Sequence, residues 1–146
     1  MPRKNLQLSA TLSPAAQEAL DQRAGESGFY SRSGAVSRAL ERYAEVCRRH
    51  LPQLSREEWM LVCDALNGAL IDPAGSVAWC WAEVSDACTL NGAAEKWGVD
   101  GAALVSRLQA LDYAGLVAVV DVAERFWAAH SRGEDSDEAL PAQRQP

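Results

Sequence analysis

The sequence predicts a mostly α-helical chain with one strand near its N-terminus. Two observations carry this prediction. Apolar and polar residues alternate over residues 5–12, and from residue 14 onward apolar residues recur at spacings of three and four. The chain has 146 residues, of which 48% are hydrophobic, so its core can be of useful size. We divide it into residues 1–50, a helical domain at 51–130, and an acidic, disordered segment at 131–146.

The strand is expected over residues 5–11, and its inward side chains are apolar. We find no second convincing strand in the sequence, and an unpaired strand leaves its backbone N–H and C=O groups unsatisfied. Pairing with the same strand of a second copy would give a two-stranded antiparallel ribbon about a two-fold axis. The sequence therefore predicts an obligate homodimer. The inward residues are Leu6, Leu8, Ala10 and Leu12, and they alternate with Asn5, Gln7, Ser9 and Thr11.

Two helices are expected to follow the strand within residues 1–50. Ser13-Pro14 is typical of a helix start, with the serine as N-cap and proline at the first helical position. The first helix should run over about residues 14–26 and end at Gly28. Its expected buried residues are Ala16, Ala19, Leu20 and Ala24. Ser31 or Ser33 should cap a second helix, whose apolar positions are Ala35, Val36, Ala39, Leu40, Tyr43 and Cys47.

The remaining helices are expected between residues 51 and 130. The run beginning at Ser55 and ending at Glu58 is a capping box, and it predicts a helix start there. Further helices are expected over about 93–97, 102–111 and 112–130. Residues 77–88 could form a helix or a short strand, and we favour the helix. The five tryptophans all fall in this region, and we interpret them as core filling.

Charge is divided unequally along the chain. Residues 1–50 carry eight Lys or Arg and five acids, for a net charge of +3, whereas the rest carries six bases and fifteen acids, for −9. Since charges act over about a Debye length, the overall −6 does not exclude a nucleic-acid partner for the first domain. Residues 51–130 are expected to lie away from the phosphate backbone.

Residues 5–45 resemble a ribbon-helix-helix domain of the Arc/MetJ type. The matching residues are Leu8-Ser9-Ala10-Thr11-Leu12, Ser13-Pro14, Leu20-Asp21, Gly28, Ser31-Arg32-Ser33, Val36, Ala39-Leu40 and Tyr43. Members of that family bind operator DNA as dimers, with the ribbon in the major groove. The resemblance implies that Gln7, Ser9 and Thr11 contact bases. It places a phosphate clamp at Ser31, Arg32 and Ser33, to which we add the basic Arg3 and Lys4.

The same resemblance implies which residues join the two copies. These are Leu8, Ala10, Leu12, Val36, Leu40 and Tyr43. The N-terminus of a helix attracts anions on physical grounds alone, so a phosphate contact at the start of the second helix does not depend on the family.

Enzymatic chemistry finds little support in the sequence. The two histidines, His50 and His130, belong to no metal-ligand spacing or catalytic triad, and there is no glycine-rich phosphate loop. The four cysteines are expected to be reduced and buried. We expect no cofactor, no metal, no membrane span and a cytoplasmic location.

The expected function is that of a homodimeric, sequence-specific transcriptional regulator, a repressor, that binds double-stranded DNA as a dimer or a dimer of dimers. Two alternatives remain open. One is an antitoxin whose helical half binds a toxin, and the other is a protein-interaction dimer without DNA binding. Residues 51–130 have no recognised role and could contact a protein or a small molecule.

Overall fold

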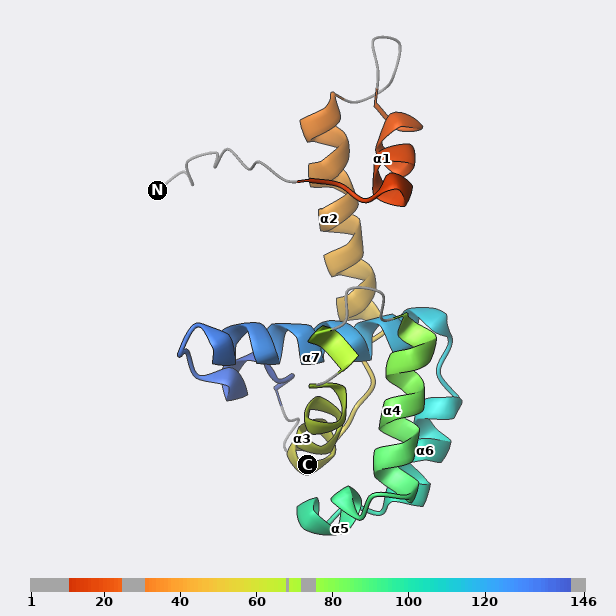
Figure 1. The fold of residues 1–146 in the computed structure, drawn as a ribbon, viewed down its shortest axis with the longest axis vertical. Helices are drawn as coiled ribbons and strands as arrows, with labels where there is room; N and C mark the ends of the chain where they lie inside the picture. The colour runs from red at the N-terminus through yellow and green to blue at the C-terminus, as the bar shows by residue number, and fades with distance from the viewer. Residues whose placement is uncertain (1–10, 25–30, 68, 72–75, 143–146) are drawn as a thin grey trace. The chain divides into compact units, whose positions relative to one another are not determined.

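The structure is a computed structural model that describes residues 11–24, 31–67, 69–71 and 76–142 (Figure 1). Within these ranges the regular structure is helical. The chain divides into two compact units, Met1–Ala44 and Glu45–Pro146, and each is considered by itself.

The structure corrects the sequence prediction of an N-terminal strand. The described residues contain no β-strand. Thr11, the last residue of the expected strand, has no regular structure, and residues 5–10 lie outside the described residues. Alternation marks a segment that could be half-buried, but a strand also needs a partner edge. The described part of the chain offers no such edge, so the fold class with an N-terminal ribbon is wrong.

The first unit contains α1, Pro14–Asp21, and most of α2, Arg32–Arg49. The hydroxyl of Ser13 accepts a hydrogen bond from the amide of Ala16 at 3.2 Å, which confirms the predicted cap. Helix α1 ends earlier than the predicted residue 26, and no residue in it is buried. Within a single copy of the chain, Ala16 and Ala19 are exposed and Leu20 is half-buried, so this copy alone does not bury the predicted apolar face.

The second unit is a helical bundle built around α3, Arg56–Leu66. Trp59, Leu61, Val62, Cys63 and Leu66 of this helix are completely buried. Helix α3 packs against α4, α5 and α7. The helices and short turns that follow α3 are η1 (Ala69–Ile71), α4 (Val77–Thr89), α5 (Ala93–Trp97), α6 (Gly101–Gln109), α7 (Tyr113–Ser131) and η2 (Ser136–Ala139).

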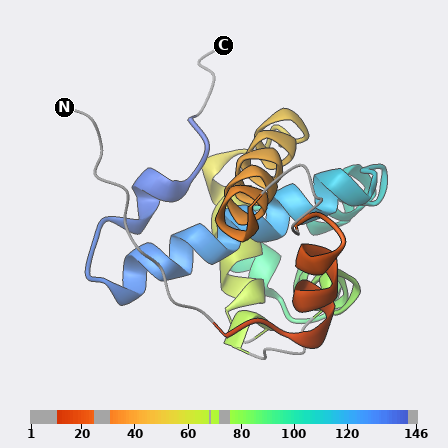
Figure 2. The same cartoon turned by 90° about the horizontal axis from the view of Figure 1, so that it is seen from above.

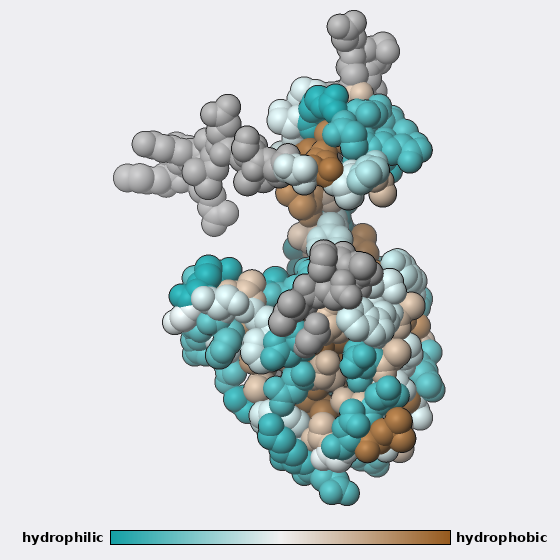
Figure 3. Space-filling view, in the orientation of Figure 1, coloured by the Kyte–Doolittle hydropathy of each residue, from teal (hydrophilic) through white to brown (hydrophobic). Residues whose placement is uncertain are grey.

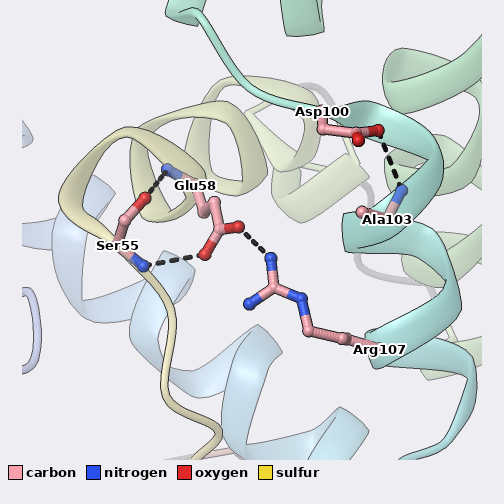
Figure 4. A network of polar contacts seen from close by, with 5 residues as sticks. All are labelled: Ser55, Glu58, Asp100, Ala103 and Arg107. Atoms are coloured by element: carbon pink, nitrogen blue, oxygen red, sulfur yellow. Dashed lines mark hydrogen bonds and ion pairs between the residues drawn. The ribbon is translucent and has the colours of Figure 1, made fainter.

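Local capping fixes where several of these helices begin. The capping box predicted at Ser55 is present, since its hydroxyl accepts from the amide of Glu58 and the Glu58 carboxylate accepts from the amide of Ser55. Figure 4 shows that the same carboxylate also receives the guanidinium of Arg107 from α6. Asp100 caps α6 by accepting from the amide of Ala103 at 3.1 Å. One glutamate thus serves a helix start and a link between two helices.

Helix α6 approaches α4 so closely that only glycine fits at one position. A Cβ built on Gly101 would lie 2.0 Å from the carbonyl oxygen of Cys88. The chain enters α6 through Gly98, which has φ of +65°, a left-handed conformation that glycine adopts at little cost. The region between Ala93 and Gln109 is therefore a packing turn of the bundle.

The acidic segment after α7 departs from the expected disorder over its described part, residues 132–142. It forms the 3-10 helix η2, which lies beside α7 in both views (Figures 1 and 2). Asp137 pairs with Arg56 at 2.6 Å, while Ala139 and Leu140 pack against the core. The acidic composition of this segment predicted disorder and did not indicate that Ala139 and Leu140 would pack against the core. None of the helices in the described ranges is long and apolar enough to cross a bilayer.

Candidate nucleic-acid and dimer interface

The start of α2 brings together two of the three residues predicted to clamp a phosphate. The Ser31 hydroxyl accepts from the amide of Gly34 at 3.1 Å, so Ser31 is the N-cap of α2. The Ser31 and Ser33 hydroxyl oxygens lie 3.4 Å apart, and both residues are exposed. The capping bond explains Ser31 without any ligand, while the second hydroxyl remains on the surface beside it.

Arg32, the third predicted clamp residue, is held by α1. Its guanidinium forms an ion pair with Asp21 at 2.9 Å, and both side chains are more than half exposed. This contact joins the last residue of α1 to the first residue of α2. Because exposed ion pairs contribute little, about 0–1 kcal/mol, an incoming phosphate could compete with Asp21 for Arg32.

Helix α2 as a whole is basic. It carries five arginines and two glutamates, for a net charge of +3. Arg38 pairs with Glu41 at 3.3 Å, whereas Arg42 makes no ion pair with a described residue. Since successive residues of a helix are rotated by about 100°, Arg38 and Arg42 lie near each other on one side of α2.

An apolar stripe lies on another side of α2. Val36, Leu40 and Tyr43 follow the helical spacing of four and three, and Leu40 is 60% exposed while Tyr43 is 42% exposed. Leu12, just before α1, is 38% exposed. Figure 3 shows hydrophobic surface in the part of the molecule formed by α1 and α2. Of the four predicted interface residues that the structure describes, Leu12, Leu40 and Tyr43 are therefore exposed, and Val36 is half-buried.

The remaining predicted site residues are only partly described. Thr11 is exposed. The other predicted base contacts, Gln7 and Ser9, lie outside the described residues. So do Arg3, Lys4, Leu8 and Ala10.

Sequence reasoning missed three residues of this surface. Asp21 was not recognised as the partner of Arg32, because nothing in the sequence indicates which residues meet across the turn between the two helices. Arg38 and Arg42 were not assigned to the phosphate contacts. Their spacing of four within a predicted helix was a signal that could have found them.

The second unit shows no arrangement typical of a metal or nucleophilic site in its described part. No group of three or more His, Cys, Asp or Glu among the described residues could hold a metal ion. All four cysteines are buried, and none of them forms a disulfide. Burial raises the pKa of the Cys63 thiol to about 12, helped by the neighbouring Asp64 carboxylate, so this thiol stays protonated and unreactive near neutral pH.

Comparison with known proteins adds no relative. No family model, no curated protein and no solved structure matches the chain. Together with the absence of a strand in the described residues, this overturns the resemblance to the ribbon-helix-helix family. The short motif around Ser13-Pro14 and Ser31 is explained by helix capping, which is common to many helical proteins.

Proposed function

We propose that the chain is a homodimeric DNA-binding transcriptional regulator, in which the first unit supplies both the dimer contact and the DNA contact. The observation that carries the proposal is the exposed apolar stripe on the arginine-rich helix α2. No β-ribbon takes part. The contacts that we assign to DNA come from α2 and its N-terminus.

The dimer part of the proposal follows from how little the first unit buries. Helix α1 has eight residues and none is buried, and helices this short are marginal in water without tertiary packing. A second copy brings an identical stripe, so a two-fold pairing covers both exposed faces at once. Val36 and Leu40 would then form the centre of the contact, with Leu12 at its edge.

The DNA part of the proposal follows from where the charges lie. By helical rotation of about 100° per residue, Arg38 lies opposite the stripe formed by Val36, Leu40 and Tyr43, and Arg42 lies close to Arg38, more than about 90° from the centre of the stripe. Pairing the stripes would leave these arginines at the surface of the dimer. Phosphates are bound by such exposed arginines and by serine hydroxyls and amides at helix N-termini, which α2 also offers at Ser31 and Ser33.

The dimer is tested by sedimentation equilibrium of the wild type, of Leu40→Gln and of Leu90→Gln. Leu90 is a matched control, since it is a leucine of the second unit that is 75% exposed. We expect Leu40→Gln to weaken dimerisation at least about tenfold, corresponding to 1.4 kcal/mol, and Leu90→Gln to have no effect. A wild type that is monomeric at every concentration would contradict the proposal.

DNA binding is tested by selection from random duplex DNA at two salt concentrations, followed by titration of the selected duplex. If about six phosphates are neutralised per dimer, log K should fall against log salt with a slope of roughly −5. The double variant Arg38→Ala/Arg42→Ala should weaken binding and flatten this slope. Arg125→Ala, in the second unit, should leave both unchanged.

A protein-interaction dimer without DNA binding is the second candidate. The apolar stripe favours a protein contact whether or not the arginines of α2 bind DNA. It predicts a stable dimer that retains no duplex in the selection experiment. An antitoxin would instead copurify with a small partner protein, and substitutions on the surface of residues 51–130 that contacts this partner would abolish the copurification.

A further inference from the structure

A hollow of about 480 Å³ opens in the second unit between α7 and the end of α3. One wall is a single face of α7, where Glu124, Trp127 and Ser131 follow the helical spacing of three and four. The opposite wall is formed by Asn67 and Leu70, which follow α3. The volume of this hollow lies within the range of about 300–1,000 Å³ that is usual for small-molecule sites.

The aromatic wall of this hollow is fixed in place. The indole N–H of Trp127 donates to the carbonyl oxygen of Cys63 at 2.7 Å, which ties the ring to the buried helix α3. The ring also makes edge contacts with Phe126 at 5.2 Å and with His130 at 5.3 Å between centroids. Because these three contacts fix the orientation of the Trp127 ring, the side chain needs little further ordering when a ligand binds.

A carboxylate without a cationic partner lines the same hollow. Glu124 makes no ion pair with any described residue, whereas the neighbouring Asp121 is paired with Arg125 at 3.1 Å. Partial burial raises the pKa of Glu124, and the charge of Asp121 raises it further. A positive charge placed beside Glu124 would relieve both effects.

We propose that this hollow binds a small organic cation, with Glu124 pairing its charge and Trp127 contacting it through a cation–π interaction. The amide of Asn67 can hydrogen-bond the ligand, and Leu70 covers its apolar part. An anionic ligand is disfavoured because Glu124 faces the hollow and Asp121 is close to it. The proposal does not depend on DNA binding or on dimer formation.

The experiment is a calorimetric titration of the full chain at pH 8 with butylammonium, benzylammonium and tetramethylammonium. Neutral benzyl alcohol has the same ring as benzylammonium and serves as the matched ligand control. We expect saturable binding of at least one cation, with a dissociation constant on the order of 1 mM or lower.

Two variants locate the site. Glu124→Gln should weaken cation binding at least about tenfold, while Glu95→Gln, which removes an exposed carboxylate on α5, should not change it. Trp127→Phe keeps an aromatic ring and should weaken binding less than Trp127→Leu; circular dichroism checks that both remain folded. Chemical-shift changes at the Trp127 indole N–H report on the site even if Trp127→Leu unfolds.

Three results would overturn the proposal: no saturable binding by any of the cations, equal binding of benzyl alcohol and benzylammonium, or full affinity in Glu124→Gln. None of them bears on the DNA-binding proposal, which is tested on the other unit.

Discussion

Both units of this chain are helical, but they differ in how many side chains their helices bury. In the second unit α3 is surrounded by other helices, and Trp59, Leu104 and Leu108 are completely buried. In the first unit α1 buries no residue, and Leu40 of α2 is 60% exposed. Capping and periodicity therefore produce helices in both units, but only in the second do those helices enclose a core within one copy of the chain.

Replacing the central tryptophan should have the largest effect on the well-packed unit. Trp59→Ala removes a side chain with no exposed surface and should cost about 3–5 kcal/mol of unfolding free energy. Urea unfolding followed by circular dichroism measures this loss. Trp79→Ala is the matched control, because Trp79 is 39% exposed, and a comparable loss there would contradict the assignment of the core.

The next largest loss of stability is expected from adding a methyl group at Gly101, where α6 contacts α4. Gly101→Ala places a Cβ against the carbonyl of Cys88, so α6 must move away from α4 at a cost of about 1–3 kcal/mol. The neighbouring exposed Ala102, changed to Ser, should shift stability by no more than about 0.5 kcal/mol. Equal denaturation midpoints for the two variants would show that α4 and α6 are not in close contact.

The first unit should differ from the second in how its stability depends on concentration. If a second copy covers the stripe on α2, a tenfold rise in protein concentration should stabilise this unit by about 0.7 kcal/mol per protomer, which is half of the 1.4 kcal/mol gained per dimer. Hydrogen exchange measured at two concentrations separates the units, because amides of α2 before residue 45 should become more protected and those of α3 should not. Protection that is independent of concentration in both units would mean that the first unit folds without a partner.

The smallest effect is expected from the carboxylate at the α7 hollow. Since Glu124 has a raised pKa in the folded state, the folded protein retains a proton that the unfolded chain loses first, so stability falls as pH rises above about 4.3 toward the folded pKa. Glu124→Gln lacks this penalty. Because Glu124 is partly solvated, the variant should be more stable at pH 8 by only a few tenths of a kcal/mol, and this gain should vanish near pH 4.

Urea unfolding at both pH values measures the difference. Glu95→Gln controls for the loss of one acidic charge. A variant that is less stable than the wild type at pH 8 would mean that Glu124 has a stabilising partner.

Helix starts were the most predictable part of this fold. Ser13, Ser55 and Asp112 each cap a helix through an amide three residues further on, so the whole interaction is visible in the local sequence. For residues 77–88 a helix was favoured over a short strand, and the structure has a helix at Val77–Thr89. The predicted strand was wrong, because alternation over residues 5–12 does not reveal whether a partner edge exists.

Burial and long-range contacts were less predictable. The apolar face of α1 is visible in the sequence, but its periodicity does not tell what covers it, and in the structure Ala16 and Ala19 remain exposed. The pairing of Arg32 with Asp21 depends on how the chain turns between the helices. The α7 hollow has one wall with clear helical spacing, but Asn67 and Leu70 are more than fifty residues away from it in the sequence.

The short helix η2 has a practical consequence for anyone who trims this protein. Its sequence is polar and acidic, so a cut after His130 looks harmless. Such a cut would remove Asp137, which pairs with Arg56 at the start of α3, and Leu140, which packs against the core of the bundle. The cut would also remove Pro141 and Ala142, which line one hollow together with Trp59. The truncated protein would therefore expose apolar surface, and its low stability would not represent the stability of the whole domain.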